Sequence, residues 1–151
     1  MRVLILNGPN LGRLGSREPD VYGAQNFVSL TKFCVDQAAS HGYSAEVRQT
    51  NDEAELISWL YEAVDSRTPV ILNPAAFTHY SYALRDACAQ VSGSGLPLVE
   101  VHLTNPASRE AFRHNSVISG VATGTIAGFG FHSYRLAISS LPVEPETDDR
   151  R

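Results

Sequence analysis

Three short polar clusters, each directly after an apolar run, constrain the fold of this chain more than any other feature. The runs and the clusters that follow them are 3–6 and 7–10, 70–72 and 73–79, and 98–101 and 102–105. If the runs are parallel strands of one sheet, the clusters meet at its carboxyl edge, where open α/β sheets bind small molecules. The pattern therefore predicts both a fold and the position of a site.

Helical periodicity fills most of the intervals between the apolar runs. Further strands are expected over 44–48 and 117–121, and helices over about 26–41, 51–67, 81–92, near 107 and between 124 and 140. Thr50 or Asn51 is expected to cap the second of these helices. Alternating strands and helices predict an α/β protein with a parallel sheet and helices on both faces. Five strands favour the flavodoxin-like order 2-1-3-4-5.

The length of 151 residues predicts one domain, which we place at 1–141. The polar stretch at about 11–24 lacks periodicity and is expected to form a lid loop. The charged, proline-containing tail at 142–151 is expected to be disordered. Cys34 and Cys88 fall on apolar helix faces and are expected to be buried, free thiols.

Composition also limits the partners of this chain. The net charge is -4 and no run of Lys or Arg is present, which argues against a nucleic-acid partner. No apolar stretch reaches the length of a membrane span, and the first apolar run is too short for a signal peptide. We therefore expect a cytoplasmic protein without a membrane partner.

Two histidines near strand ends are candidates for acid–base chemistry. His102 follows the fourth strand, and imidazole is suited to proton transfer near neutral pH. Glu100 lies two residues earlier, on the same side of the strand, and can orient this histidine. The alternatives are that His102 and His79 are structural, or that they bind a metal with Glu100, although the spacing matches no standard ligand motif. Lys32 lies on the polar side of a helix and is a poor candidate for Schiff-base chemistry.

The remaining polar candidates are amides, arginines and a tyrosine. Asn10 and Asn73 can hold a hydroxyl or a water, or can simply form turns. Free tyrosine has a pKa of about 10, and Arg17 can lower that of Tyr22 in the same loop, unless the loop is merely solvated. Arg109 and its i+4 neighbour are expected to share a helix face that places an anion or faces solvent.

Five strings in the chain resemble, in order and spacing, those of type II 3-dehydroquinate dehydratase, a shikimate-pathway lyase also called type II dehydroquinase. The strings are Leu6–Gly12, Arg17–Gly23, Asn73–His79, Ala83–Ala87 and Glu100–Asn105. The resemblance extends from the first residue to about Leu141. It implies dehydration of 3-dehydroquinate to 3-dehydroshikimate through an enolate, with no cofactor or metal.

The resemblance also implies roles for individual residues. Tyr22 would be the base, Arg17 on the lid would keep it ionised, and His102 would be the acid. Asn10 would position a water at the enolate. The substrate-binding residues implied are Asn73, His79, Leu103, Thr104 and Arg113, with Asp86 from a neighbouring subunit of a dodecamer built from trimers.

Two positions depart from the family pattern. Ala75 stands where the family commonly has Gly, and the extra Cβ is expected to tighten the turn beside the substrate. Thr104 replaces the commoner Ser but keeps the hydroxyl. A catalytic role in quinate breakdown and a non-catalytic, flavodoxin-like binding domain are the alternatives, although the loop after the first strand has few of the hydroxyls that a phosphate site needs.

Overall fold

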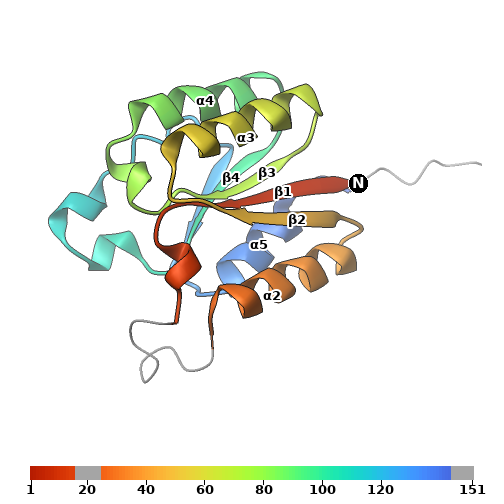
Figure 1. The fold of residues 1–151 in the computed structure, drawn as a ribbon, viewed down its shortest axis with the longest axis horizontal. Coiled ribbons are helices and arrows are strands. Elements are labelled where there is room, and N and C mark those ends of the chain that lie inside the picture. The colour runs from red at the N-terminus through yellow and green to blue at the C-terminus, as the bar shows by residue number, and fades with distance from the viewer. Residues whose placement is uncertain (16–24, 144–151) are drawn as a thin grey trace, which may run out of the picture.

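The computed structural model of this chain describes residues 1–15 and 25–143. Its centre is a five-stranded parallel sheet in the order β2-β1-β3-β4-β5 (Figure 1). The strands are β1 (Arg2–Asn7), β2 (Ser44–Gln49), β3 (Val70–Asn73), β4 (Leu98–His102) and β5 (Gly124–Ala127). The predicted flavodoxin-like strand order is confirmed.

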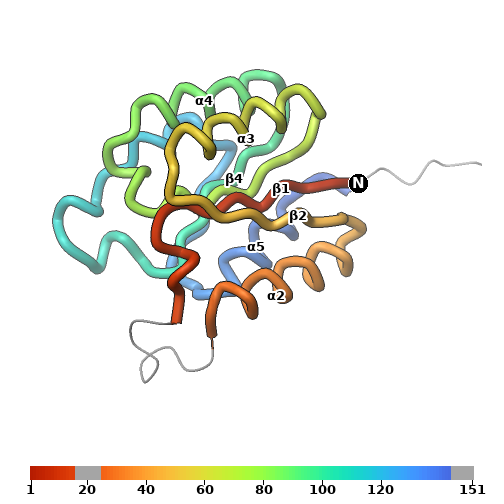
Figure 2. The backbone as a smooth tube through the Cα atoms, viewed as in Figure 1, coloured from red at the N-terminus to blue at the C-terminus, as the bar shows by residue number. Residues whose placement is uncertain are grey.

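Helices cover both faces of the sheet, as predicted. Helices α3 (Glu53–Asp65) and α4 (Tyr82–Gly93) lie on one face, and α2 (Phe27–Ser40) and α5 (His132–Ser140) lie on the other (Figure 1). Short 3-10 helices follow three strands at their carboxyl ends: η1 (Leu11–Arg13), η2 (Ala75–His79), η3 (Pro106–Ser108) and η4 (Ala111–His114). In Figure 2 these turns gather at the end of the sheet away from the N-terminus.

The sheet separates two apolar cores. On β1, Leu4 and Leu6 belong to the core under α3 and α4, whereas Val3 and Ile5 belong to the core over α2 and α5. This alternation follows from the two-residue period of a strand. Cys34 and Cys88 are buried and free, as predicted, and burial raises the pKa of each thiol to about 12. Both thiols therefore stay protonated and belong to the core.

The cap of α3 differs from the prediction. Asp52, and neither Thr50 nor Asn51, is the N-cap, because its carboxylate accepts a hydrogen bond from the Ala54 N–H at 2.9 Å. Thr50 instead accepts from the Asp52 N–H, and Asn51 accepts from the Asn10 N–H. Neighbouring residues of similar capping preference cannot be ranked by sequence alone.

The last third of the chain corrects two further predictions. The expected strand at 117–121 consists of bends and turns, and the last strand is β5. Ile118 is fully buried in the core under α3 and α4, so the apolar run reflects burial of a turn. The final helix begins at His132, well after the residue expected, because residues 124–127 form the strand.

The expected lid and tail fall largely outside the described residues. Residues 11–13 form η1, while positions 16–24 of the expected lid lie beyond what the structure describes. Of the expected tail, only residues 142 and 143 are described. The lid and the disordered tail therefore stay predictions.

Candidate active site

The segments after β1, β3 and β4 enclose a cavity of about 290 Å³ at the carboxyl edge of the sheet. This front cavity is where the polar clusters were expected to meet. Its lining comes from all three segments: Pro9, Asn10, Leu11, Asn73, Ala75, Ala76, His79, His102, Leu103, Thr104, Pro106, Arg109 and Arg113. The wall therefore combines amides, imidazoles and guanidinium groups.

A close backbone approach joins the first two segments. The Gly8 N–H donates to the Asn73 carbonyl at 2.8 Å, and a Cβ on Gly8 would lie 2.7 Å from the Pro74 carbonyl oxygen. Only glycine permits this approach. Asn10 follows with φ 70°, a left-handed conformation that asparagine tolerates better than most residues. Gly8 thus brings Asn10 to the cavity wall.

A buried hydrogen-bond chain fixes the same two segments from below. The Tyr134 hydroxyl of α5 donates to Asn7 Oδ1 at 2.6 Å and accepts from Asn73 Nδ2 at 2.9 Å. Asn73 Oδ1 accepts from the Ala75 N–H at 3.1 Å. Burial raises the pKa of Tyr134, so its hydroxyl stays protonated. Asn7 is therefore structural, and the amide of Asn73 is held in one orientation.

Tyr134 could not be recognised as part of the site from the sequence. A tyrosine on the apolar side of a helix has the same sequence signal as any core aromatic residue. Only the packing of α5 against β1 and β3 shows that its hydroxyl reaches two strand-end asparagines.

The strongest chemical feature is a pair formed by His102 and Glu100. His102 Nε2 lies 2.6 Å from Glu100 Oε2, as expected for a carboxylate that orients an imidazole. Glu100 is fully buried in β4, while the His102 side chain keeps 12% of its exposure and lines the front cavity. The pair thus reaches from the interior of the sheet to the cavity.

Hydroxyl groups surround the Glu100 carboxylate. Thr78 donates to Oε2 at 2.6 Å, Ser119 donates to Oε1 at 2.6 Å, and Ser116 lies near both oxygens at 3.4 and 3.5 Å. Burial raises the pKa of Glu100, but hydrogen bonds from His102, Ser119 and Thr78 lower it by more. The pKa stays below its usual value of 4.5, so the carboxylate is ionised near neutral pH.

His79 and Arg113 border the front cavity on its other side. His79 Nδ1 lies 2.8 Å from the Asn115 carbonyl oxygen, and its ring meets Phe112 edge-on. Arg113 donates to Glu110 at 2.7 Å and stacks over Phe112. The structure therefore holds both side chains through the segment that follows β4.

The predicted helix that places Arg109 and Arg113 on one face is wrong. Pro106 begins η3, Arg109 is its C-cap, and Arg113 lies in the separate η4. Both nevertheless line the front cavity, and Arg109 Nη1 lies 3.3 Å from the Thr104 hydroxyl. Tertiary packing, and not the spacing of a helix, therefore brings the two arginines to the same cavity.

The other predicted residues have different positions. Asn105 caps η3 by accepting from the Ala107 N–H and does not line the front cavity. Asp86 of α4 is 73% exposed, pairs with Arg85, and is also absent from that lining. Arg17 and Tyr22 lie outside the described residues. Within residues 1–15 and 25–143, no three His, Cys, Asp or Glu side chains gather as a metal site would require.

A second cavity lies behind the His102–Glu100 pair. This rear cavity, of about 220 Å³, is lined by Thr78, Glu100, His102, Ser116 and Ser119, among other residues. It shares His79, His102, Pro106 and Arg113 with the front cavity. The pair therefore forms part of the wall between two spaces.

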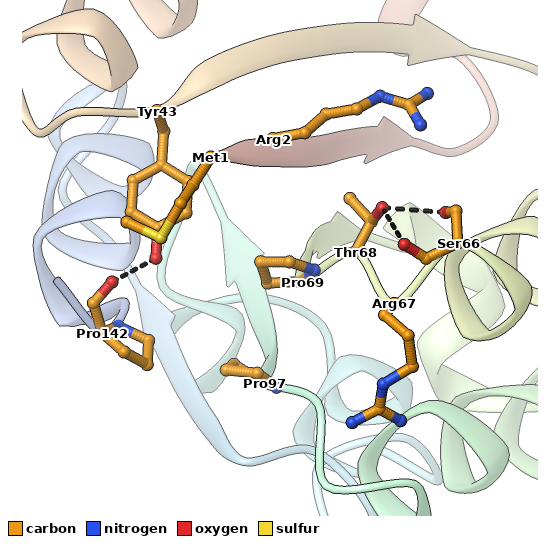
Figure 3. A pocket seen from close by; sticks show the side chains of 9 residues that line it. All are labelled: Met1, Arg2, Tyr43, Ser66, Arg67, Thr68, Pro69, Pro97 and Pro142. Atoms are coloured by element: carbon orange, nitrogen blue, oxygen red, sulfur yellow. Dashed lines mark hydrogen bonds between the residues drawn. The ribbon is translucent and has the colours of Figure 1, made fainter. Parts of the chain in front are cut away.

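A larger cavity, of about 430 Å³, lies at the opposite, amino edge of the sheet (Figure 3). Met1, Tyr43 and three prolines form most of its wall. Its arginines have partners: Arg2 pairs with Glu46, and Arg67 donates to the Ser94 carbonyl. Because none of the described residues that line it is a histidine, an aspartate or a glutamate, this cavity offers no acid–base pair among them, and the front cavity is the candidate active site.

The fold and the site together define a flavodoxin-like α/β protein with an acid–base pair at the carboxyl edge of its sheet. The family model of class II dehydroquinases matches residues 1–142. A 3-dehydroquinate dehydratase of Salinispora tropica is 53% identical over 93% of this chain and 96% of that protein. The chain belongs to the class II dehydroquinase family.

Solved structures give the same result. The type II dehydroquinase of Propionibacterium acnes matches with a TM-score of 0.83 and 45% identity, over 91% of this chain and 95% of that one. The enzyme of Butyrivibrio crossotus matches with a TM-score of 0.85 and 41% identity, over 92% and 95%. Among the described residues, no helix is long and apolar enough to cross a membrane.

Proposed function

We propose that this chain removes water from 3-dehydroquinate in the front cavity, with Tyr22 as base and His102 as acid. Dehydration of 3-dehydroquinate is the shikimate-pathway reaction of its family, and the chain is an enzyme of that type. The observation that carries the assignment of the site is the His102–Glu100 pair at the wall of a strand-end cavity. The same reaction would serve quinate breakdown.

The first step is loss of a proton from C2 of the substrate, next to the C3 ketone. The Tyr22 phenolate takes this proton, and the electron pair of the C–H bond forms the enolate between C2 and C3. The Arg17 guanidinium lowers the pKa of the tyrosine and stabilises the developing charge. Asn10 holds a water against the enolate oxygen, which agrees with its place on the cavity wall.

The second step is departure of the C1 hydroxyl. The enolate re-forms the ketone, the C1–C2 double bond forms and the C1–O bond breaks, while His102 gives a proton so that water leaves. Because Nε2 is held by Glu100, the proton passes through the other ring nitrogen, Nδ1. The ionised Glu100 holds Nε2 and so orients the ring for this transfer.

The remaining residues of the front cavity bind the substrate. Its carboxylate accepts hydrogen bonds from the backbone amides of Leu103 and Thr104 and from the Thr104 hydroxyl. Arg109, 3.3 Å from that hydroxyl, adds positive charge at the same place. His79, Arg113 and Asn73 lie where ring hydroxyls can be held.

We also propose that the chain assembles into trimers and then a dodecamer. Asp86 lies outside the front cavity of its own chain, and is 73% exposed. Tyr82 and Phe112, 71% and 60% exposed, are large apolar side chains that such contacts would cover. Asp86 would then reach the site of a neighbouring subunit. We place the reaction in the cytoplasm.

The test is the growth of ultraviolet absorbance from the conjugated product after 3-dehydroquinate is added to the purified protein, with EDTA present. We expect wild type to be active and Tyr22→Phe and His102→Ala to lose most activity. No product from folded wild type would refute the enzyme and favour a non-catalytic binding domain. Full activity in Tyr22→Phe would instead refute the choice of base.

A further inference from the structure

We infer that Ser119 is a positioning residue for the dehydration, acting on His102 through the carboxylate of Glu100. The inference rests on the proposed function and extends the site to a residue outside the front cavity. Ser119 lies in the turn that precedes β5 and lines the rear cavity.

Ser119 differs from the other hydroxyls around Glu100. Its hydroxyl donates to Oε1 at 2.6 Å, whereas Thr78 and His102 both bond to Oε2. Ser116, the other hydroxyl near Oε1, is 3.4 Å away and also accepts from the backbone of its own turn. Ser119 therefore makes the short hydrogen bond to Oε1, the carboxylate oxygen that does not contact His102.

The geometry explains what this bond does. A carboxylate bound through only one oxygen can rotate about its last side-chain torsion, which is broad. With Ser119 on Oε1 and Thr78 on Oε2, the carboxylate plane is fixed from both sides. Oε2 is then held 2.6 Å from His102 Nε2, which fixes the tautomer and the direction of the imidazole.

The titratable groups around Glu100 come from several elements. His102 faces it from β4, and Cys88 faces it from α4, since Glu100 contributes to the raised pKa of that thiol. His79, Arg113 and His114 share the wall of the rear cavity with it. Loss of the Ser119 donor removes one of the hydrogen bonds that keep Glu100 ionised.

The test uses Ser119→Ala, with Ser119→Thr as the conservative variant. Threonine keeps the hydroxyl and adds one methyl group to a residue that lines the rear cavity. We expect the alanine variant to lose about tenfold in kcat with little change in KM, because one hydrogen bond to a charged group is lost. The acidic limb of its pH–rate profile should move to higher pH, and threonine should restore both.

Ser92→Ala is the matched control, because Ser92 is a partly buried serine whose hydroxyl donates to the backbone of α4, away from Glu100. It should leave kcat and the pH profile unchanged. If Ser119→Ala does not fold, Ser119→Cys keeps the shape with a weaker donor and should show an intermediate loss.

The inference would be overturned if the alanine variant kept the wild-type kcat and the acidic limb of its pH–rate profile did not move. If the alanine variant does not fold, the same result in the cysteine variant would overturn it. Failure of threonine to restore kcat would also overturn it. Inactivity of the wild type in the same assay would refute the proposed function instead, so the two failures are distinguishable.

Discussion

At the scale of single residues, Ala75 shows how one Cβ bears on the site. Its φ of 50° lies in the left-handed region, which glycine adopts without strain. An L residue there costs about 1–2 kcal/mol. The glycine that the family resemblance leads us to expect at this turn would adopt this φ without strain.

We therefore expect Ala75→Gly to raise the free energy of unfolding by about 0.5–1 kcal/mol, since relief of strain exceeds the added freedom of the unfolded chain. KM should change and kcat should not, because the methyl group lies on the wall and outside the His102–Glu100 pair. Denaturant unfolding and steady-state kinetics measure both. Arg67→Gly, at φ 52° by the amino-edge cavity, is the control and should leave KM unchanged. A lower free energy of unfolding in Ala75→Gly than in wild type would contradict the claim that Ala75 is strained.

The buried Glu100 predicts a pH dependence of stability. Its pKa is held below 4.5 in the folded state, so its hydrogen bonds stabilise the fold above that pH and are lost as pH falls through the folded-state pKa. Near neutral pH, Glu100→Gln should be less stable than wild type, and this difference should shrink below pH 4.5. Unfolding curves at several pH values measure it. The exposed Glu110→Gln should show a much smaller effect, and a difference independent of pH would contradict the prediction.

At the scale of elements, α5 connects the carboxyl ends of the adjacent strands β1 and β3, where two of the segments that line the front cavity begin. The single hydroxyl of Tyr134 in this helix bonds to both Asn7 and Asn73. The strands supply the spacing of the loops, and this hydroxyl holds the amide of Asn73 in place. Stability and geometry of the site are therefore coupled through a helix on the opposite side of the sheet from α3 and α4.

Tyr134→Phe should lower the free energy of unfolding by about 1–3 kcal/mol, because two buried amide atoms lose their partner. It should also lower kcat/KM, since the turn at Asn73 loses its support. Tyr43→Phe is the matched control: its hydroxyl donates to the Pro142 carbonyl at the other end of the sheet. That variant should lose stability without a kinetic effect. Unchanged kinetics in Tyr134→Phe would show that the strands alone fix the loop.

The position of the fifth strand differs from the one that the sequence pattern predicts. The apolar pattern predicts a strand at Val117, Ile118 and Val121. In the structure these residues form a turn that packs against the core under α3 and α4. Residues 124–127 carry a weaker apolar signal and form β5, because pairing with β4 supplies the hydrogen bonds. Local periodicity reports burial, and strand pairing decides which buried segment is extended.

At the scale of the whole molecule, the proposed assembly would let one subunit complete the site of another. Asp86 does not line the front cavity of its own chain. If it acts in a neighbouring subunit, His102→Ala and Asp86→Ala each remove a different half of a shared site. Mixed assemblies would then contain some complete sites.

We expect mixtures of His102→Ala and Asp86→Ala, dissociated and reassembled together, to regain activity that neither variant shows alone. Steady-state assays and the mass in solution test this together. Asp36→Ala, an exposed acid paired with Lys32 on α2, is the control and should be fully active by itself. Mixtures as inactive as their components, in an assembled protein, would contradict a role of Asp86 across subunits.

The sheet order, the edge at which the polar clusters meet and the pairing of Glu100 with His102 could all be predicted from the sequence. These follow from strand periodicity and from polar residues placed at strand ends, both of which are local. Tertiary structure alone decided which turn becomes β5, that Tyr134 joins Asn7 to Asn73, and that Ser119 reaches Glu100. These contacts join residues 19 to 127 positions apart, and no periodic pattern encodes them because each depends on how packed elements bring single side chains together.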